Sequence, residues 1–133
     1  MSHIQQADAM PLSGLRVLVV EDAFLIAEDL ADQLSMWGCE VIGPDGHVSR
    51  ALEQIGDNEL DGALLDVNLK NETSFPIASA LAARGIPFVF LTGYDSDTVF
   101  PNEFRSSPKI GKPVDPELLA RVMEQHFKRA SHT

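Results

Sequence analysis

The feature that most constrains the fold of this chain is a series of short apolar runs that alternate with segments of helical periodicity. The runs are rich in β-branched and aromatic side chains, as is typical of strands buried on both faces of a parallel sheet. They cover residues 15–20, 41–43, 62–65, 87–91 and, more weakly, 109–111. The alternation predicts an α/β fold: a doubly wound, flavodoxin-like parallel sheet of five strands, in the order 2-1-3-4-5, with helices on both faces.

The segments between the runs carry helix signals. Apolar residues recur at helical spacing over about 26–37, 48–55, 74–84 and 115–127, and Gly38, Gly56 and Gly85 supply stops. Residues 95–108 break this rhythm because they contain two prolines, one Asn and three Ser residues, so the fourth helix is expected to be short or irregular.

Length and composition indicate a single domain. With 133 residues, 44% of them hydrophobic, the chain can bury one core. We expect a domain over residues 14–129, preceded by a flexible N-terminal arm (1–13) and followed by a short tail (130–133). No run reaches transmembrane length, the polar N-terminus does not resemble a secretory signal, and Cys39 is the only cysteine. A cytoplasmic protein without a membrane partner is therefore expected.

The charge of the chain restricts its partners further. A formal net charge of -10 and a pI of about 4.6 argue against direct binding to nucleic acid, which requires Lys and Arg to displace counterions. The acidity has two interpretations, which are general solubility and a concentrated acidic site that binds a cation.

Polar residues terminate the predicted strands. The first strand ends at Glu21 and Asp22, the third at Asp66, the fourth at Thr92 and the fifth at Lys112. In an open parallel sheet of this order these strand ends are neighbours, and ligands bind outside the carboxyl ends of the strands. The five side chains are therefore predicted to converge on one edge.

Three neighbouring carboxylates repel one another unless a cation lies between them. Mg²⁺ prefers a few carboxylates and keeps several waters, so Glu21, Asp22 and Asp66 are candidate Mg²⁺ ligands together with the backbone carbonyl of Asn68. Asp66 could then act as a nucleophile that forms an acyl phosphate. Lys112 would neutralise developing charge on the phosphoryl group, and the Thr92 hydroxyl would donate to one of its oxygens.

At these residues the sequence resembles the CheY-like receiver domain of response regulators. The matching segments are Val19-Val20-Glu21-Asp22, Leu64-Leu65-Asp66-Val67-Asn68-Leu69, Leu91-Thr92-Gly93-Tyr94 and Lys112-Pro113. The resemblance implies Mg²⁺ binding by the acidic pair, phosphorylation of Asp66, and phosphate contacts by Thr92 and Lys112. It also implies a cis peptide bond before Pro113.

The sequence departs from the common receiver pattern at Lys109. Many receivers have Tyr or Phe three residues before the lysine, and that ring turns inward when the Thr moves toward the phosphate. The run Phe90-Leu91-Thr92-Gly93-Tyr94 resembles a receiver subgroup with a Phe-Ala-Thr-Gly-x-Tyr motif, although Leu91 replaces Ala and Tyr94 follows Gly directly. We hypothesise that Thr92, Tyr94 and residues 95–108 carry the conformational response instead.

The resemblance predicts a signalling domain rather than a turnover enzyme. It would accept a phosphoryl group from a sensor histidine kinase or a histidine phosphotransfer protein and signal to an unidentified downstream protein by contact in a phosphorelay. The exposed edge beside Phe24 and Leu25 is a candidate docking surface, with core packing as the alternative.

Two other functions remain open. One is a Mg²⁺-dependent phosphatase or phosphotransferase with an aspartyl phosphate intermediate, against which stands Asn68, where an aspartate would serve as the general acid. The other is a degenerate receiver that acts only as a binding module.

Overall fold

The structure is a computed structural model that describes residues 11–93 and 100–128. The strands of its main sheet are β1 (Arg16–Val20), β2 (Glu40–Asp45), β3 (Gly62–Asp66), β6 (Phe88–Thr92) and β7 (Lys109–Gly111). The helices are α2 (Phe24–Met36), α3 (Val48–Asp57), α4 (Phe75–Ala83) and α5 (Pro116–His126). All neighbouring strands are parallel and the order is β2-β1-β3-β6-β7, which confirms the predicted 2-1-3-4-5 sheet.

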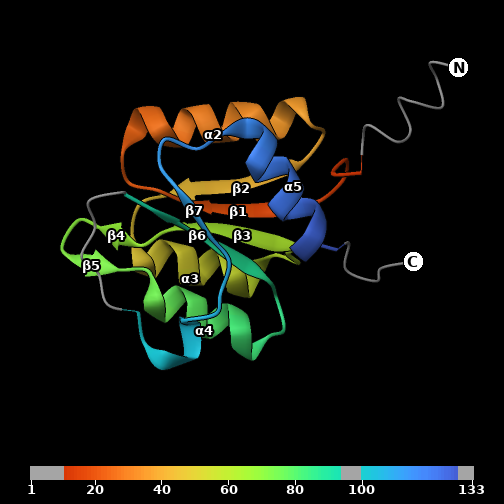
Figure 1. Ribbon diagram of the computed structural model, residues 1–133. Helices are drawn as coiled ribbons and strands as arrows, with labels where there is room; N and C mark the ends of the chain where they lie inside the picture. The colour runs from red at the N-terminus through yellow and green to blue at the C-terminus, as the bar shows by residue number, and fades with distance from the viewer. Residues whose placement is uncertain (1–10, 94–99, 129–133) are drawn as a thin grey trace, which may run out of the picture.

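The helices cover the sheet in two layers, with α2 and α5 on one face and α3 and α4 on the other (Figure 1). Each face has its own hydrophobic core. Leu30 and Leu34 of α2 pack with Leu119 and Met123 of α5 against one face of β1 and β3. On the opposite face, α3 and α4 contribute buried residues that include Ile55, Ile77 and Leu81. Because both faces are covered, every residue of β3 is buried, as its continuous apolar run predicts.

The structure differs from the sequence prediction in three places. A short antiparallel hairpin of β4 (Asn68–Leu69) and β5 (Glu72–Thr73) follows β3 and was not predicted. Leu12, which we placed in the flexible arm, is only 4% exposed and packs in the core, where its carbonyl accepts a hydrogen bond from the Cys39 thiol. The folded region therefore begins before residue 14.

The third difference lies in β2, which continues through a cis Gly43–Pro44 peptide bond to Asp45.

Between β6 and β7 the structure describes residues 100–108, where the chain forms a 3₁₀ turn (Asn102–Phe104). The prediction that residues 95–108 form only a short or irregular helix is confirmed for residues 100–108. Residues 94–99 lie outside the described range. In the described segments no helix is long and apolar enough to cross a membrane.

Gly62 provides a test of the packing between β3 and the C-terminal end of α5. A Cβ atom at Gly62 would lie 2.5 Å from the ring of Phe127, whereas one at Gly56, inside α3, would meet nothing within 4 Å. Gly62→Ala is therefore expected to destabilise the fold by about 1–3 kcal/mol, since it displaces a buried ring. Gly56→Ala should stabilise it by about 0.5–1 kcal/mol through helix propensity. Urea denaturation of both variants measures the difference, and equal effects would show that Phe127 does not pack as described.

Candidate metal centre

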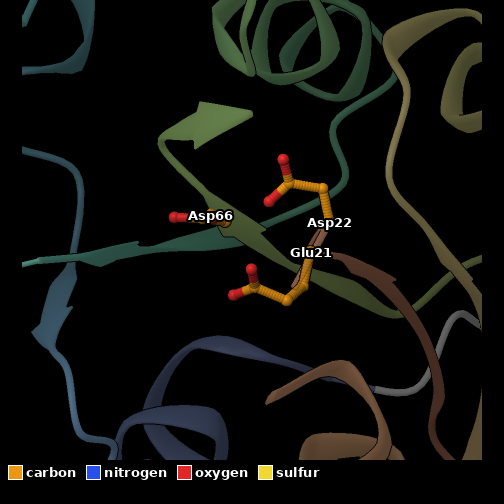
Figure 2. A group of neighbouring side chains, drawn as sticks. All are labelled: Glu21, Asp22 and Asp66. Carbon is orange, nitrogen blue, oxygen red and sulfur yellow. The ribbon is translucent and has the colours of Figure 1, made fainter. Parts of the chain in front are cut away.

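Three carboxylates meet at the carboxyl edge of the sheet. Val20 pairs with Leu65 in the ladder between β1 and β3, so the next residues, Glu21 and Asp66, emerge side by side. Asp22 follows directly. Figure 2 shows the three side chains turned into the same space at the ends of the two strands. One carboxylate oxygen from each lies within 4.8 Å of the others, so the predicted acidic cluster exists.

A lysine from the far end of the sheet completes this cluster. Lys112 follows β7, and its backbone N–H donates to the Thr92 carbonyl at the end of β6 with a distance of 2.8 Å. The Lys112 ammonium lies 2.8 Å from Glu21 Oε1 and 3.1 Å from Asp66 Oδ1. It therefore joins the carboxylate that follows β1 to the one that ends β3. The peptide bond from Lys112 to Pro113 is cis, in agreement with the resemblance.

Burial strengthens the interactions between the charged groups of this centre, because it removes them from water. Glu21 and Asp66 are buried and Asp22 is half-buried. Desolvation, followed by the charge and the hydrogen bond of Glu21, raises the pKa of Asp66 from 3.8 to about 7, although Lys112 opposes the shift. Burial alone would lower the pKa of Lys112, but Glu21 and Asp66 outweigh it and the pKa is raised. The centre thus holds more carboxylates than its single lysine neutralises.

Backbone groups hold two of the carboxylates in place. The Ala23 N–H donates to Glu21 Oε2 at 3.1 Å, and the Lys70 N–H donates to Asp22 Oδ2 at 2.8 Å. The second bond comes from the β4–β5 hairpin, which the apolar pattern of the sequence does not predict. Its turn contains Asn71 with a φ of 60°, and asparagine tolerates the left-handed region better than most residues. That residue type was the available signal for the turn.

The donor set fits a small, hard divalent cation. Three carboxylate oxygens in one partly open space are ligands that Mg²⁺ accepts, and the positive charge would offset both the burial and the repulsion from Glu21 that raise the pKa of Asp66. Asn68 starts β4, two residues after Asp66, so the proposed carbonyl ligand lies close in the chain. Thr92 is half-buried at the end of β6. Tyr94, the other predicted switch residue, lies outside the described residues.

Fold and site together define a flavodoxin-like α/β domain with an acidic centre at the carboxyl edge of its sheet. No protein-family model matches the chain. It is 31% identical over 121 residues to an uncharacterized response regulatory protein of Vibrio vulnificus, a match that covers 90% of this chain and 50% of that protein. The chain thus spans about half the length of that relative.

Solved structures show the same likeness. SdrG of Sphingomonas melonis Fr1 superposes with a TM-score of 0.74 at 41% identity, covering 83% of this chain and 93% of SdrG. SdrG is also known in a BeF3-activated conformation, with a TM-score of 0.68 and 39% identity over 84% of this chain and 95% of that one. The signal receiver domain of a modulated diguanylate cyclase from Desulfovibrio desulfuricans has a TM-score of 0.75 at 31% identity, over 85% and 93% of the two chains. The chain belongs to the CheY-like receiver domains of response regulators, which act in two-component systems.

The raised pKa of Asp66 predicts an unusual pH dependence of the metal-free protein. The folded state keeps a proton on Asp66 up to about pH 7, whereas the unfolded chain releases it near its ordinary value of 3.8. Between these values the folded state binds more protons, so the contribution of Asp66 to stability is expected to fall as the pH rises.

Urea denaturation at a series of pH values, in the presence of a chelator, measures this trend. Asp66→Asn should lack this part of the decline, because its side chain does not titrate. Added Mg²⁺ should restore stability near neutral pH in the unaltered protein more than in the variant. Parallel curves for the two proteins would contradict the raised pKa.

Proposed function

We propose that this receiver domain accepts a phosphoryl group on Asp66 from a phosphohistidine of a sensor histidine kinase or a histidine phosphotransfer protein. The observation that carries the proposal is the position of Asp66. It is the last residue of β3, it lies among two further carboxylates, and its oxygen is 3.1 Å from the Lys112 ammonium. A carboxylate nucleophile needs neighbours of this kind to approach a negatively charged phosphoryl group.

The transfer replaces one bond to phosphorus by another. An Asp66 carboxylate oxygen bonds to phosphorus while the bond from phosphorus to the donor imidazole breaks, and the imidazole nitrogen keeps the electron pair. Asp66 must be ionised to attack, so the fraction that holds a proton near pH 7 is unreactive. Lys112, already 3.1 Å from Asp66, balances charge on the phosphoryl oxygens.

Two further groups complete the proposed machinery. Thr92 ends the strand beside β3, where its hydroxyl can donate to a phosphoryl oxygen. Glu21, Asp22, Asp66 and the Asn68 carbonyl would hold Mg²⁺, which would supply further positive charge to the phosphoryl oxygens.

The outcome of phosphorylation is proposed to be a change in protein contacts. A phosphoryl group adds about one and a half to two negative charges at neutral pH, which can shift the balance between two arrangements of nearby loops. That the related SdrG adopts a BeF3-activated conformation supports a response of this kind. The downstream partner would recognise the altered arrangement.

Incubation with acetyl phosphate and Mg²⁺ tests the acceptor directly by intact mass. The unaltered chain is expected to gain one phosphoryl group, and Asp66→Asn none. Asp57→Asn, a matched change at the exposed end of α3, should behave as the unaltered chain. Lys112→Met is expected to slow the reaction by roughly a hundredfold, because it removes a cation from the developing charge.

The mass measurement, together with assays of Mg²⁺ binding and of phosphate ester hydrolysis, separates the alternatives. An equal mass gain in Asp66→Asn would exclude Asp66 as the acceptor. Binding of Mg²⁺ without any mass gain would indicate a binding module, and steady hydrolysis of small phosphate esters would indicate an enzyme.

The proposed phosphodonor would dock beside the acidic centre. Phe24 and Leu25, at the start of α2, are 71% and 72% exposed, which shows that they are not core residues. A groove of about 340 Å³ lies between α2 and the start of α5, lined by residues that include Ile26, Leu30 and Lys112. Phe24 lines a separate hollow together with Glu21 and Asp22, so an exposed apolar side chain borders the acidic centre, as suits a docking protein partner.

Phe24→Ala tests this surface. Phosphorylation by a histidine phosphotransfer protein should slow by about tenfold, since a truncated apolar anchor costs more than 1 kcal/mol of binding. Phosphorylation by acetyl phosphate should be unchanged. Met36→Ala, which removes another exposed side chain at the opposite end of α2, is the control. Equal slowing with both donors would place the effect in the chemistry rather than in docking.

A further inference from the structure

We propose that Lys109 is a positioning residue that clamps residues 100–107 onto β6 and so holds the resting arrangement of the strand that carries Thr92. The proposal deepens the proposed function and rests on it, because it concerns the response of the same site. It also answers what stands in place of the inward-turning aromatic residue of other receivers.

The Lys109 ammonium uses all of its hydrogen-bonding capacity on one segment. An ammonium group has three N–H donors and no acceptor. Its nitrogen lies 2.8 Å from the Arg105 carbonyl oxygen, 2.9 Å from that of Ser107 and 3.3 Å from that of Phe104. The first of these carbonyls to appear in the chain ends the 3₁₀ turn Asn102–Phe104 and the other two follow it, and a cation that binds the last carbonyls of a turn stabilises its end. A lysine that merely points into solvent would not converge on three main-chain oxygens.

The same ammonium also holds the start of the segment. It lies 4.5 Å from the centroid of the Phe100 ring, within the range of a cation–π contact. Lys109 therefore contacts the Phe100 ring as well as the carbonyls of Phe104, Arg105 and Ser107, and so links the two ends of the segment. This linked segment is called the clamped unit.

This unit packs on the sheet through aromatic rings. Phe100 and Phe104 both contact Phe90 of β6, with centroid distances of 5.1 and 5.7 Å. Both also contact Phe75 of α4, at 5.5 and 5.8 Å. Phe90 and Phe104 are buried. Any displacement of residues 100–107 must therefore rearrange rings that rest directly on the strand leading to Thr92.

The clamp and the acidic centre share one pair of strands. In the ladder between β6 and β7, Phe90 pairs with Lys109 and Thr92 pairs with Gly111. The next residue, Lys112, donates its N–H to the Thr92 carbonyl. Lys109 thus lies at the first pair of a ladder whose last pair contains Thr92, and Lys112 follows that last pair directly. Release of the clamp would make a shifted arrangement of this ladder easier to reach.

Amide exchange in the unphosphorylated protein tests the clamp itself. The amides of Phe104, Arg105 and Ser107 donate within the 3₁₀ turn and the residues that follow it, so they report its opening. In Lys109→Met they are expected to exchange about tenfold faster, because the charge-assisted bonds to the carbonyls are lost. Lys128→Met, which removes an exposed lysine after α5, should leave them unchanged. Unchanged exchange in Lys109→Met would overturn the clamp.

The positioning role needs a second measurement that a purely local contact would not affect. Phosphorylation by acetyl phosphate is expected to be at least about threefold faster in Lys109→Met, because the resting arrangement is less favoured. Lys109→Arg, which keeps the cation, should stay close to the unaltered chain. Faster exchange without any change in phosphorylation rate would overturn the positioning role.

A further variant guards against misfolding. Phe100→Leu keeps an apolar side chain but removes the ring beneath the ammonium, and a smaller increase in the same exchange rates is expected. If the unaltered chain gains no phosphoryl group, the proposed function fails, whereas the exchange results still decide whether Lys109 clamps the segment.

Discussion

The rest of the structure depends on the parallel register of β1 and β3, which places Glu21 beside Asp66 at a buried edge. Two carboxylates in that position, with a third close by, cannot all be charged comfortably without a cation. Lys112, which follows the edge strand β7, supplies one positive charge, and the pKa of Asp66 remains raised. The site thus holds an excess of negative charge, which the proposed divalent ion would offset and to which the proposed phosphoryl group would add.

The parts of the molecule that surround this edge differ in how firmly they are held. β1 and β3 are enclosed by helices on both faces, and their positions leave little freedom to the carboxylates. β7 is an edge strand of only three residues. The irregular segment before it accepts hydrogen bonds from the Lys109 ammonium through its main-chain carbonyls. In this arrangement of a well-packed acidic centre beside a short edge strand, the proposed phosphoryl group would shift β7 and leave β1 and β3 in place.

Much of the fold could be predicted because apolar runs and helix signals are local properties of the chain. The runs that became β1, β3 and β6 are continuous, since both sheet faces are covered, and each stops at a polar residue. The β4–β5 hairpin escaped prediction because it has two-residue strands and no apolar alternation. The buried position of Leu12 also could not be read from the sequence, because it depends on packing in the same core cluster as Cys39, far along the chain.

The order of residues along the chain is enough to place the chemical groups at the strand ends, because the acidic pair, Asp66, Thr92 and Lys112 each interrupt or follow an apolar run. The contacts between those groups arise from the folded arrangement, in which Lys112 bridges Glu21 and Asp66 and a hairpin amide restrains Asp22. The same arrangement turns Lys109 back to carbonyls a few residues earlier in the chain. The physical reason is that strand periodicity is set by neighbouring residues, whereas hydrogen bonds and ion pairs depend on distances that exist only after the sheet has assembled.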